Sequence, residues 1–330
     1  MTTRTNAPAE NFARTPDKLA AIRAALFAEY RKRHKSPWIV AYSGGKYSTL
    51  LLQLVFETLL ALPAEERKRR VHVVGYDTGT ESPPATDHLR NSIGVIQKAI
   101  GKMDLPMTTT ITKPCIDQTF WVNVIGRGCI PSTRSFRWRT DHMKNFPANQ
   151  FIRCITNAQR KSVLLVGARN SAPTKCARPM VAHNQIKNCR IFSPLDELTD
   201  GEAQAILAQS RPAWGGSHRN LVNSGFGKLA PLLGFRKWVF ALRKEDTNRL
   251  PFRRDGSVKY RADGSRVRGP FKMEVRRDIL KRLKTLESNV GATLLSKPEE
   301  TVIEDIWWRD ELQYESRDAL IRAVGAVPAV

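Results

Sequence analysis

Residues 38–49, which read Trp38-Ile39-Val40-Ala41-Tyr42-Ser43-Gly44-Gly45-Lys46-Tyr47-Ser48-Thr49, decide the fold of this chain. The first five form a short apolar run, which predicts a buried strand, and the leucine-rich segment from Thr49 to Leu62 predicts a helix. The two glycines between them would let backbone amides approach a ligand closely. The start of the helix would add free N–H groups and the positive end of its dipole. This arrangement suits phosphate, with a charge from Lys46 and hydroxyl donors from Ser43, Ser48 and Thr49.

The residues Ser43-Gly44-Gly45 would also be typical of an ordinary Gly-Gly turn capped by serine. The stretch is not a Walker A loop, because the pattern G-x-x-x-x-G-K-[ST] is absent. Both interpretations therefore stay open at this point.

On either side of this stretch, predicted strands and helices alternate. Strands are expected at 71–76, 107–112 and 162–166, and helices at about 15–30 and 84–100. The strand at 71–76 ends at Asp77, and the strand at 162–166 runs into Gly167-Ala168-Arg169. Such alternation predicts an α/β fold, a parallel sheet flanked by helices, with ligands beyond the carboxyl ends of the strands.

After about residue 194 the pattern changes. Helices are expected at 198–209 and 273–286, and two Asp-Gly turns, Asp255-Gly256 and Asp263-Gly264, predict a small hairpin. We therefore expect an N-terminal helical segment at 1–35, an α/β domain at 36–195 and a basic, mainly helical extension at 196–330.

The charge balance indicates a polyanionic partner. Lys and Arg number 54 against 31 Asp and Glu, a formal net charge of +23, and residues 236–284 alone hold 17 Lys/Arg against 6 Asp/Glu. Nucleic acid is the partner expected first, an anionic membrane surface is second, and a basic surface kept for solubility is the third interpretation. With 41% apolar and 26% charged residues, the composition excludes a wholly disordered chain. No run of 18 apolar residues and no apolar signal core occur, so we expect a cytoplasmic protein without a membrane partner.

Cysteine and histidine spacing gives no sign of a metal site. The five cysteines contain no C-x-x-C pair, and the six histidines contain no H-x-x-H or H-E-x-x-H pair. We expect reduced, mostly structural thiols and no metal held by the protein.

Several stretches together resemble a known family. The segment from Ser43 to Ser48 resembles the S-G-G-x-D-S pyrophosphate loop of the N-type ATP pyrophosphatase and PAPS reductase superfamily. Further stretches narrow the resemblance to the DndC-like proteins, the sulfurtransferase-like component of DNA phosphorothioate modification. In chain order, over residues 36 to about 312, these are Asp77-Thr78-Gly79, Thr119 to Gly128, Phe136-Arg137-Trp138, Gly167-Ala168-Arg169, Pro212-x-Trp214-Gly215-Gly216 and Gly269-Pro270-Phe271.

The resemblance implies an adenine-nucleotide alpha hydrolase fold that splits ATP between its α- and β-phosphates, with Mg²⁺ as an accessory ion. The adenylyl group would activate a substrate oxygen, which sulfur then displaces. The implied catalytic residues are Lys46, Asp77 and Arg137, and Lys144 is a further candidate contact. The implied nucleotide-binding residues are Ser43, Gly44, Gly45, Lys46, Ser48, Thr49 and Arg169. Other subunits of a DNA-modification or defence complex are the implied protein partners.

The sequence also departs from the family pattern. Tyr47 stands where the family has Asp, and Arg139 where it has Cys. Residues 226–242, where the family carries an iron–sulfur cysteine cluster, contain no cysteine, so we expect no such cluster. A catalytically impaired subunit that binds nucleotide and DNA is therefore the first alternative. A PAPS reductase-like enzyme is the second, and it would have to use Cys189, the last cysteine in the chain.

Overall fold

A computed structural model describes residues 15–34, 36–81, 83–129, 141–156, 161–167, 189–216 and 270–325. The chain divides into two compact units. The first comprises Met1–Asp77, Pro83–Lys113 and Pro147–Gly225, and the second comprises Thr78–Ser82, Pro114–Phe146 and Phe226–Val330. The predicted boundaries at 35 and 195 stay predictions.

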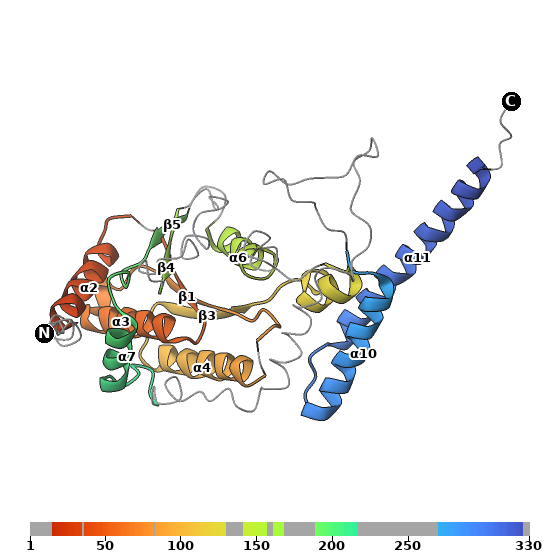
Figure 1. The fold of residues 1–330 in the computed structure, drawn as a ribbon. Coiled ribbons are helices and arrows are strands. Elements are labelled where there is room, and N and C mark those ends of the chain that lie inside the picture. The colour runs from red at the N-terminus through yellow and green to blue at the C-terminus, as the bar shows by residue number, and fades with distance from the viewer. Residues whose placement is uncertain are drawn as a thin grey trace, which may run out of the picture. The chain divides into compact units, whose positions relative to one another are not determined.

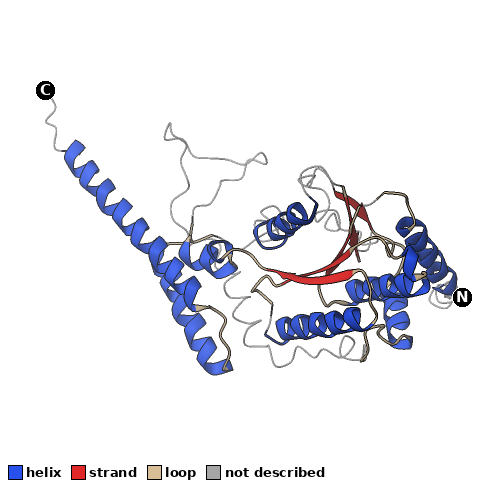
Figure 2. Ribbon diagram, turned by 180° about the vertical axis from the view of Figure 1, so that it is seen from behind, coloured by secondary structure: helices blue, strands red, loops and turns tan. Residues whose placement is uncertain are grey.

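The first unit is built on a five-stranded parallel sheet (Figures 1 and 2). Its strands are β1 (Trp38–Tyr42), β2 (Val71–Tyr76), β3 (Met107–Thr112), β4 (Ser162–Val166) and β5 (Cys189–Phe192), in the order β3-β2-β1-β4-β5. All four pairings are parallel, and Trp38 of β1 lies opposite both Val71 of β2 and Val163 of β4. The predicted parallel α/β sheet flanked by helices is therefore confirmed.

Successive residues of the strands pack into two different cores, one on each face of the sheet. Trp38, Val40 and Tyr42 of β1 join the larger core, whereas Ile39 and Ala41 join the smaller one. Because side chains alternate along a strand, a strand covered on both faces reads as an unbroken apolar run. This explains why residues 38–42 show no polar alternation.

In the described part of the first unit, helices cover both faces of the sheet, four on one face and one on the other (Figure 1). The larger core contains residues of α2 (Thr15–Tyr30), α3 (Lys46–Ala61), α4 (Pro83–Lys102) and α7 (Asp200–Gln209). On the opposite face, Ile152 of α6 (Phe146–Thr156) packs against the smaller core. A short 3₁₀ turn, η1 (Ala64–Glu66), precedes β2. Helices therefore pack against both faces of the sheet, and the loops at its carboxyl edge extend from well-packed strands.

The second unit has its own core, in which a buried arginine connects three segments. Its elements are η2 (Ile116–Gln118), η3 (Val122–Gly126), η4 (Asp141–Asn145), α10 (Met273–Val290) and α11 (Lys297–Gly325). Arg276 of α10 donates to the carbonyls of Gly126 and Phe271 over 2.8 and 2.9 Å, and to Asp310 Oδ2 of α11 over 2.8 Å. A Cβ on Gly128, at φ +68°, would lie 2.5 Å from Arg276 Nε, so this position requires glycine.

Most of the helices and strands lie where the sequence predicts them. The helix expected at 198–209 begins at Asp200, because Thr199 caps it in a reciprocal capping box with Glu202. The helix expected at 273–286 continues to Val290. Strand β5 and helices α6 and α11 were not predicted, and the expected hairpin at 255–264 lies outside the described residues. Within the described part of the chain, no helix is long and apolar enough to cross a membrane.

His72 on β2 makes stability depend on pH. Its Nδ1 lies 2.7 Å from Thr108 Oγ1 on β3, and its ring meets Phe151 edge-on with the ring centroids 5.9 Å apart. Burial, and then the nearby Arg70, lower the pKa of His72. Since the folded pKa lies below the unfolded one, protonation favours the unfolded chain, and stability falls as pH drops through the unfolded value of about 6.5. We expect urea unfolding at pH 7.5 and 5.5 to show a smaller loss for His72→Gln than for the unaltered protein, and equal losses would contradict this.

Candidate functional site

The loop between β1 and α3 presents the amino end of a helix at the carboxyl edge of the sheet. Helix α3 begins at Lys46, and its N-cap residue, Gly45, makes no side-chain capping bond. No acidic residue lies in the first helical turn. Within the described residues no side-chain cap at Gly45 satisfies this end of the helix, so the amides of Lys46 and Ser48 can serve an external acceptor, and no acidic side chain in the first turn of α3 neutralises the positive end of its dipole.

Two serines hold the loop in shape from within. Ser48 Oγ accepts from the backbone N–H of Ser43 over 3.2 Å and donates to the carbonyl of Gly45 over 3.0 Å. Ser43 Oγ lies 3.1 Å from Ser48 Oγ and accepts from the amide of Gly45 over 3.3 Å. Ser48 and Thr49 are buried, whereas Ser43 is exposed. The loop is therefore preorganised, and Ser48 supports it rather than facing solvent.

Gly44 lies close to His88, a neighbour that the sequence did not reveal. Gly44 has φ +72°, and a Cβ there would lie 3.3 Å from His88 Cδ2 on α4. His88 Nε2 is a buried atom with no hydrogen-bond partner among the described residues. A lone histidine in an amphipathic helix carries no signal of such a position, because it depends on how α4 packs beside the loop.

Gly167 brings a second strand end against the same loop. A Cβ on Gly167 would lie 2.5 Å from the carbonyl oxygen of Tyr47 and 3.0 Å from the amide nitrogen of Ser48. Strands β2 and β3, the next two in the chain, lie on one side of β1, whereas β4 and β5 lie on the other side, so the strand order reverses between β1 and β4. In open parallel sheets, ligands bind beyond the carboxyl ends of strands at such a switch point.

Tyr47, the residue that departs from the family pattern, is anchored to α7. Its hydroxyl donates to Asp200 Oδ1 over 2.8 Å, and its ring packs against the larger core. Tyr47 therefore has a structural partner of its own and does not stand in for a carboxylate facing the loop.

Asp77 lies directly beyond β2 and is paired with two cations. Only 6% of the residue is exposed, and its amide donates to the carbonyl of Thr112 over 3.0 Å. Arg90 Nη2 donates to Asp77 Oδ2 over 2.9 Å, and Lys113 Nζ lies 3.5 Å from the same oxygen. The predicted position at the carboxyl edge is found, while its catalytic role stays a prediction.

The other predicted site residues are placed as follows. Lys46 is half-buried, and among the described residues no hydrogen bond or ion pair engages its ammonium group. Lys144 is exposed in η4 of the second unit. Arg137 and Arg169 lie outside the described residues. The stretch from Trp121 to Gly128 contributes to the core of the second unit, where the amide of Phe271 donates to the carbonyl of Gly128 over 2.7 Å.

The described residues contain no group of three or more His, Cys, Asp or Glu side chains that could hold a metal ion. Four cysteines lie in the described ranges as free thiols, of which Cys115 and Cys154 are exposed. Burial raises the pKa of both Cys129 and Cys189, which disfavours their thiolates. The predicted lack of an iron–sulfur cluster stays a prediction.

Neither a comparison with protein-family models nor a search of curated proteins found a match to this chain. Similar solved structures include the phosphoadenylyl-sulfate (PAPS) reductase from Candida auris in a phosphate complex, with 11% identity and a TM-score of 0.36 over 62% of this chain and 88% of that one. The U34-tRNA thiolase NcsA from Methanococcus maripaludis, with its 4Fe-4S cluster, gives 9% identity and a TM-score of 0.36, over 90% of this chain and 80% of that one. The NH3-dependent NAD synthetase from Campylobacter jejuni gives 13% identity and a TM-score of 0.38, over 69% of this chain and 86% of that one. At these identities and TM-scores, the similarity extends to neither ligand nor activity.

Proposed function

We propose that this chain is an adenine-nucleotide alpha hydrolase-type protein that binds ATP at the β1–α3 loop. More narrowly, we propose a DndC-like ATP pyrophosphatase/sulfurtransferase of DNA phosphorothioate modification or an associated defence system. The observation that carries the proposal is the uncapped amino end of α3 at the switch point of a parallel sheet, beside left-handed Gly44. The ordered sequence resemblance supports the narrower assignment.

In this proposal each loop residue acts on the polyphosphate of ATP. The first-turn amides of α3 bind phosphate oxygens, Gly44 keeps a side chain out of their way, and Lys46 balances the negative charge. A substrate oxygen attacks the α-phosphorus, the bond to the bridging oxygen breaks, and pyrophosphate leaves with the bonding electrons. A sulfur nucleophile at the oxidation level of sulfide, supplied by a donor outside this chain, then forms a bond to the activated atom of the substrate, and the bond from that atom to oxygen breaks as AMP leaves with the oxygen.

Magnesium fits this loop poorly as a protein-held ion. Tyr47 replaces the loop carboxylate and is bonded to Asp200, while Asp77 faces Arg90 and Lys113. Mg²⁺ is commonly bound through substrate phosphates with few protein ligands, so ATP itself would carry the ion.

Two alternative functions are kept. The anchoring of Tyr47 to Asp200 favours the first, a nucleotide- and DNA-binding subunit without turnover, because the family carboxylate is replaced by a residue with a different structural partner. The second, a PAPS reductase-like enzyme, would need a reactive thiolate. The raised pKa of the partly buried Cys189 argues against it.

Gly44→Ala is expected to weaken ATP binding at least tenfold in calorimetric titrations. The new Cβ would press on His88, and the left-handed backbone would cost about 1–2 kcal/mol, so the loop would move away from the geometry that holds phosphate. Gly291→Ala is the matched control, because Gly291, at the end of α10, has φ +65° and a Cβ added there would meet nothing within 4 Å. Equal ATP affinity in both variants would remove the loop from the proposed site.

Pyrophosphate release separates the enzyme from the binding subunit. The unaltered protein is assayed with ATP and Mg²⁺, with and without DNA, beside Lys46→Ala. Release that Lys46→Ala abolishes supports the pyrophosphatase, and ATP binding without release supports the alternative. Failure of the unaltered protein to bind ATP would contradict both.

A further inference from the structure

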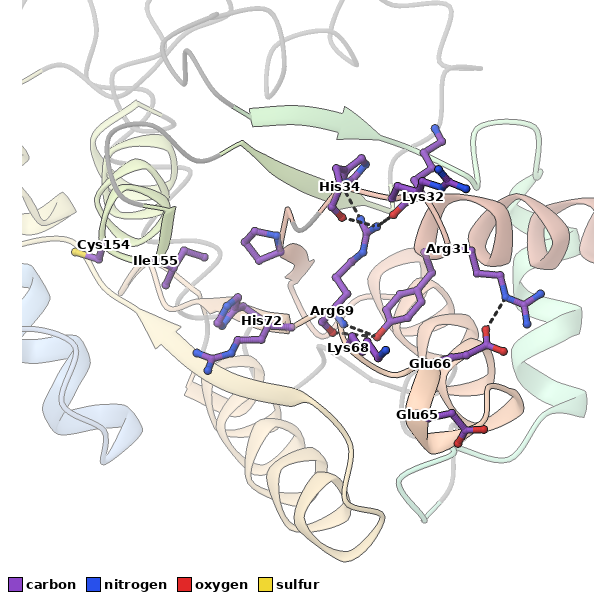
Figure 3. Close-up of a pocket in the computed structure, with 14 residues that line it drawn as sticks. Arg31, Lys32, His34, Glu65, Glu66, Lys68, Arg69, His72, Cys154 and Ile155 are labelled. Atoms are coloured by element: carbon purple, nitrogen blue, oxygen red, sulfur yellow. Dashed lines mark hydrogen bonds and ion pairs between the residues drawn. The ribbon is translucent and has the colours of Figure 1, made fainter.

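Two basic runs come together at the edge of the sheet opposite the β1–α3 loop. Residues 31–34 read Arg-Lys-Arg-His shortly before β1, and residues 67–70 read Arg-Lys-Arg-Arg directly before β2. Trp38 opposes Val71 in the parallel β1–β2 pair, and the amide of Trp38 donates to the carbonyl of Arg70 over 2.9 Å. Because the amino ends of these strands are neighbours, the two runs lie side by side (Figure 3).

Between the two runs lies an open pocket with a volume of about 890 Å³. Two glutamates, Glu65 and Glu66, line it together with six cationic side chains, those of Arg31, Lys32, Arg33, Lys68, Arg69 and Arg70. Arg31 is paired with Glu66 over 2.9 Å, whereas no ion pair within the described residues engages Arg33, Lys68 or Arg70. These three side chains are exposed, so they can reach a bound anion.

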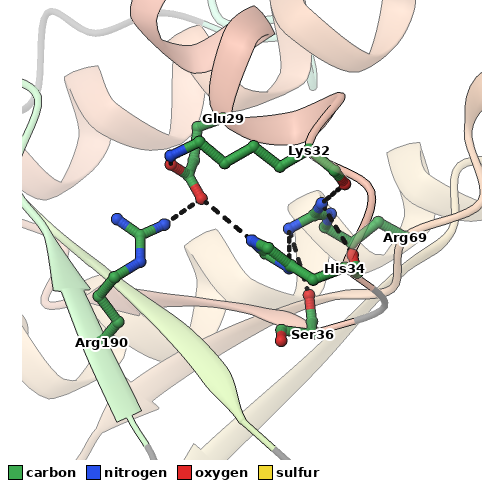
Figure 4. A network of polar contacts seen from close by, with 6 residues as sticks. All are labelled: Glu29, Lys32, His34, Ser36, Arg69 and Arg190. Atoms are coloured by element: carbon green, nitrogen blue, oxygen red, sulfur yellow. Dashed lines mark hydrogen bonds and ion pairs between the residues drawn. The ribbon is translucent and has the colours of Figure 1, made fainter.

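Arg69 fixes the pocket from within (Figure 4). Only 6% of it is exposed, and its guanidinium donates to the carbonyls of Lys32 and His34 over 2.7 and 3.1 Å and lies over the ring of Tyr30 at 5.5 Å. Its Nε is a buried atom with no hydrogen-bond partner among the described residues. This arginine holds the first basic run against the second and adds a positive charge behind both.

Glu29 neutralises a different part of this region. The buried carboxylate accepts from Lys32 Nζ over 2.7 Å and from Arg190 of β5, and it lies 3.6 Å from His34 Nε2 (Figure 4). Burial, and then Arg69, lower the pKa of His34. Glu29 thus balances charge around Lys32 and Arg190, while Arg33, Lys68 and Arg70 have no ion pair within the described residues.

We propose that this pocket binds the phosphodiester backbone of DNA, through Arg33, Lys68 and Arg70. Cations spread over two runs around an open pocket match a chain of phosphates better than a single one. Tyr30 lines the pocket but is only 4% exposed, so its ring offers no face for stacking a base. We therefore expect contacts to the backbone that are independent of sequence. The choice of DNA as the polyanion rests on the proposed function, whereas the site itself is separate from the ATP loop.

The test measures the salt dependence of binding to a fluorescein-labelled DNA duplex by anisotropy. The pocket variant is the triple variant Arg33→Gln, Lys68→Gln, Arg70→Gln. The slope of log affinity against log salt, measured between 50 and 200 mM, is expected to become shallower by up to about 2.7, because each lost phosphate contact removes about 0.9. We also expect the variant to bind DNA at least about tenfold more weakly. The matched control is Lys98→Gln, Lys102→Gln, Arg211→Gln, which removes the same charge from exposed positions of the same unit that do not line the pocket. The control should keep the slope of the unaltered protein.

Equal losses in both triple variants, or no loss in the pocket variant, would overturn the proposal. So would a pocket variant that keeps DNA binding but loses binding to phosphatidylserine vesicles, which would make the partner a membrane. Circular dichroism tests whether the pocket variant is folded, and calorimetry with ATP tests separately whether its β1–α3 loop still binds the nucleotide. Conversely, Gly44→Ala should leave the salt dependence of DNA binding unchanged. Failure of the ATP proposal and failure of this one therefore give different results.

Discussion

Arg276→Ala is expected to lower the free energy of unfolding of the second unit by about 3 kcal/mol. Arg276 is among the most buried charged residues described, and its side chain satisfies two carbonyls and Asp310 at once. Its removal would leave the carbonyls of Gly126 and Phe271 without this donor and Asp310 without its charge partner. Hydrogen exchange in α10 and α11, with urea unfolding of the whole chain, measures the loss.

Arg277→Ala is the matched control for this change. Arg277 is the next residue on α10 and pairs with Glu311 over 2.7 Å, but 59% and 50% of the two side chains are exposed. Exposed pairs contribute at most about 1 kcal/mol, so α10 and α11 should keep nearly all of their protection. Similar losses in the two variants would show that the buried arginine does not organise this core.

Gly167→Ala is expected to reduce ATP affinity at least tenfold and to destabilise the first unit by about 1–3 kcal/mol. The added Cβ would lie 2.5 Å from the Tyr47 carbonyl oxygen and 2.7 Å from its carbon. Both atoms belong to the backbone, so no side-chain rotation can relieve the contact. Either the loop or the end of β4 must shift, and the first turn of α3 would shift with the loop. Calorimetry with ATP and urea unfolding follow the two effects.

Gly94→Ala is expected to change stability in the opposite direction. Gly94 lies inside α4, and a Cβ there would meet no atom within 4 Å. Alanine stabilises a helix interior by about 0.5–1 kcal/mol relative to glycine, so Gly94→Ala should raise stability and leave ATP affinity unchanged. If Gly167→Ala behaved like Gly94→Ala, the close approach of β4 to the loop would be wrong.

The first unit was predictable from sequence wherever its signals are local. An apolar run, two glycines and a leucine-rich helix follow one another between Trp38 and Leu62, so the strand, loop and helix could be placed without knowledge of the rest. Strand β5 is only four residues long and only partly buried, and its sequence, Cys-Arg-Ile-Phe, shows neither clear alternation nor an apolar run.

The contacts around the candidate site could not be predicted, because each depends on packing between distant segments. Asp77 could be placed at a strand end, but its pairing with Arg90 and Lys113 depends on where α4 and the end of β3 lie. The basic pocket had a readable signal, two basic runs shortly before adjacent strands. The charge excess at 236–284 is the larger signal in the sequence, and residues 217–269 within and beside that region lie outside the described part of the chain.

The length of β1 has a geometric consequence for how the two proposed sites can cooperate. Basic residues lie near its amino end and the ATP loop follows its carboxyl end, and β1 has five residues, which span roughly 16 Å at about 3.3 Å per residue. That distance is far longer than the separation of two reacting atoms. A phosphate bound in the pocket therefore cannot be the one that reacts at the loop. The pocket would serve as a tether, and the reacting phosphate would belong to a different stretch of the same DNA, which must curve around the sheet edge, or to another molecule.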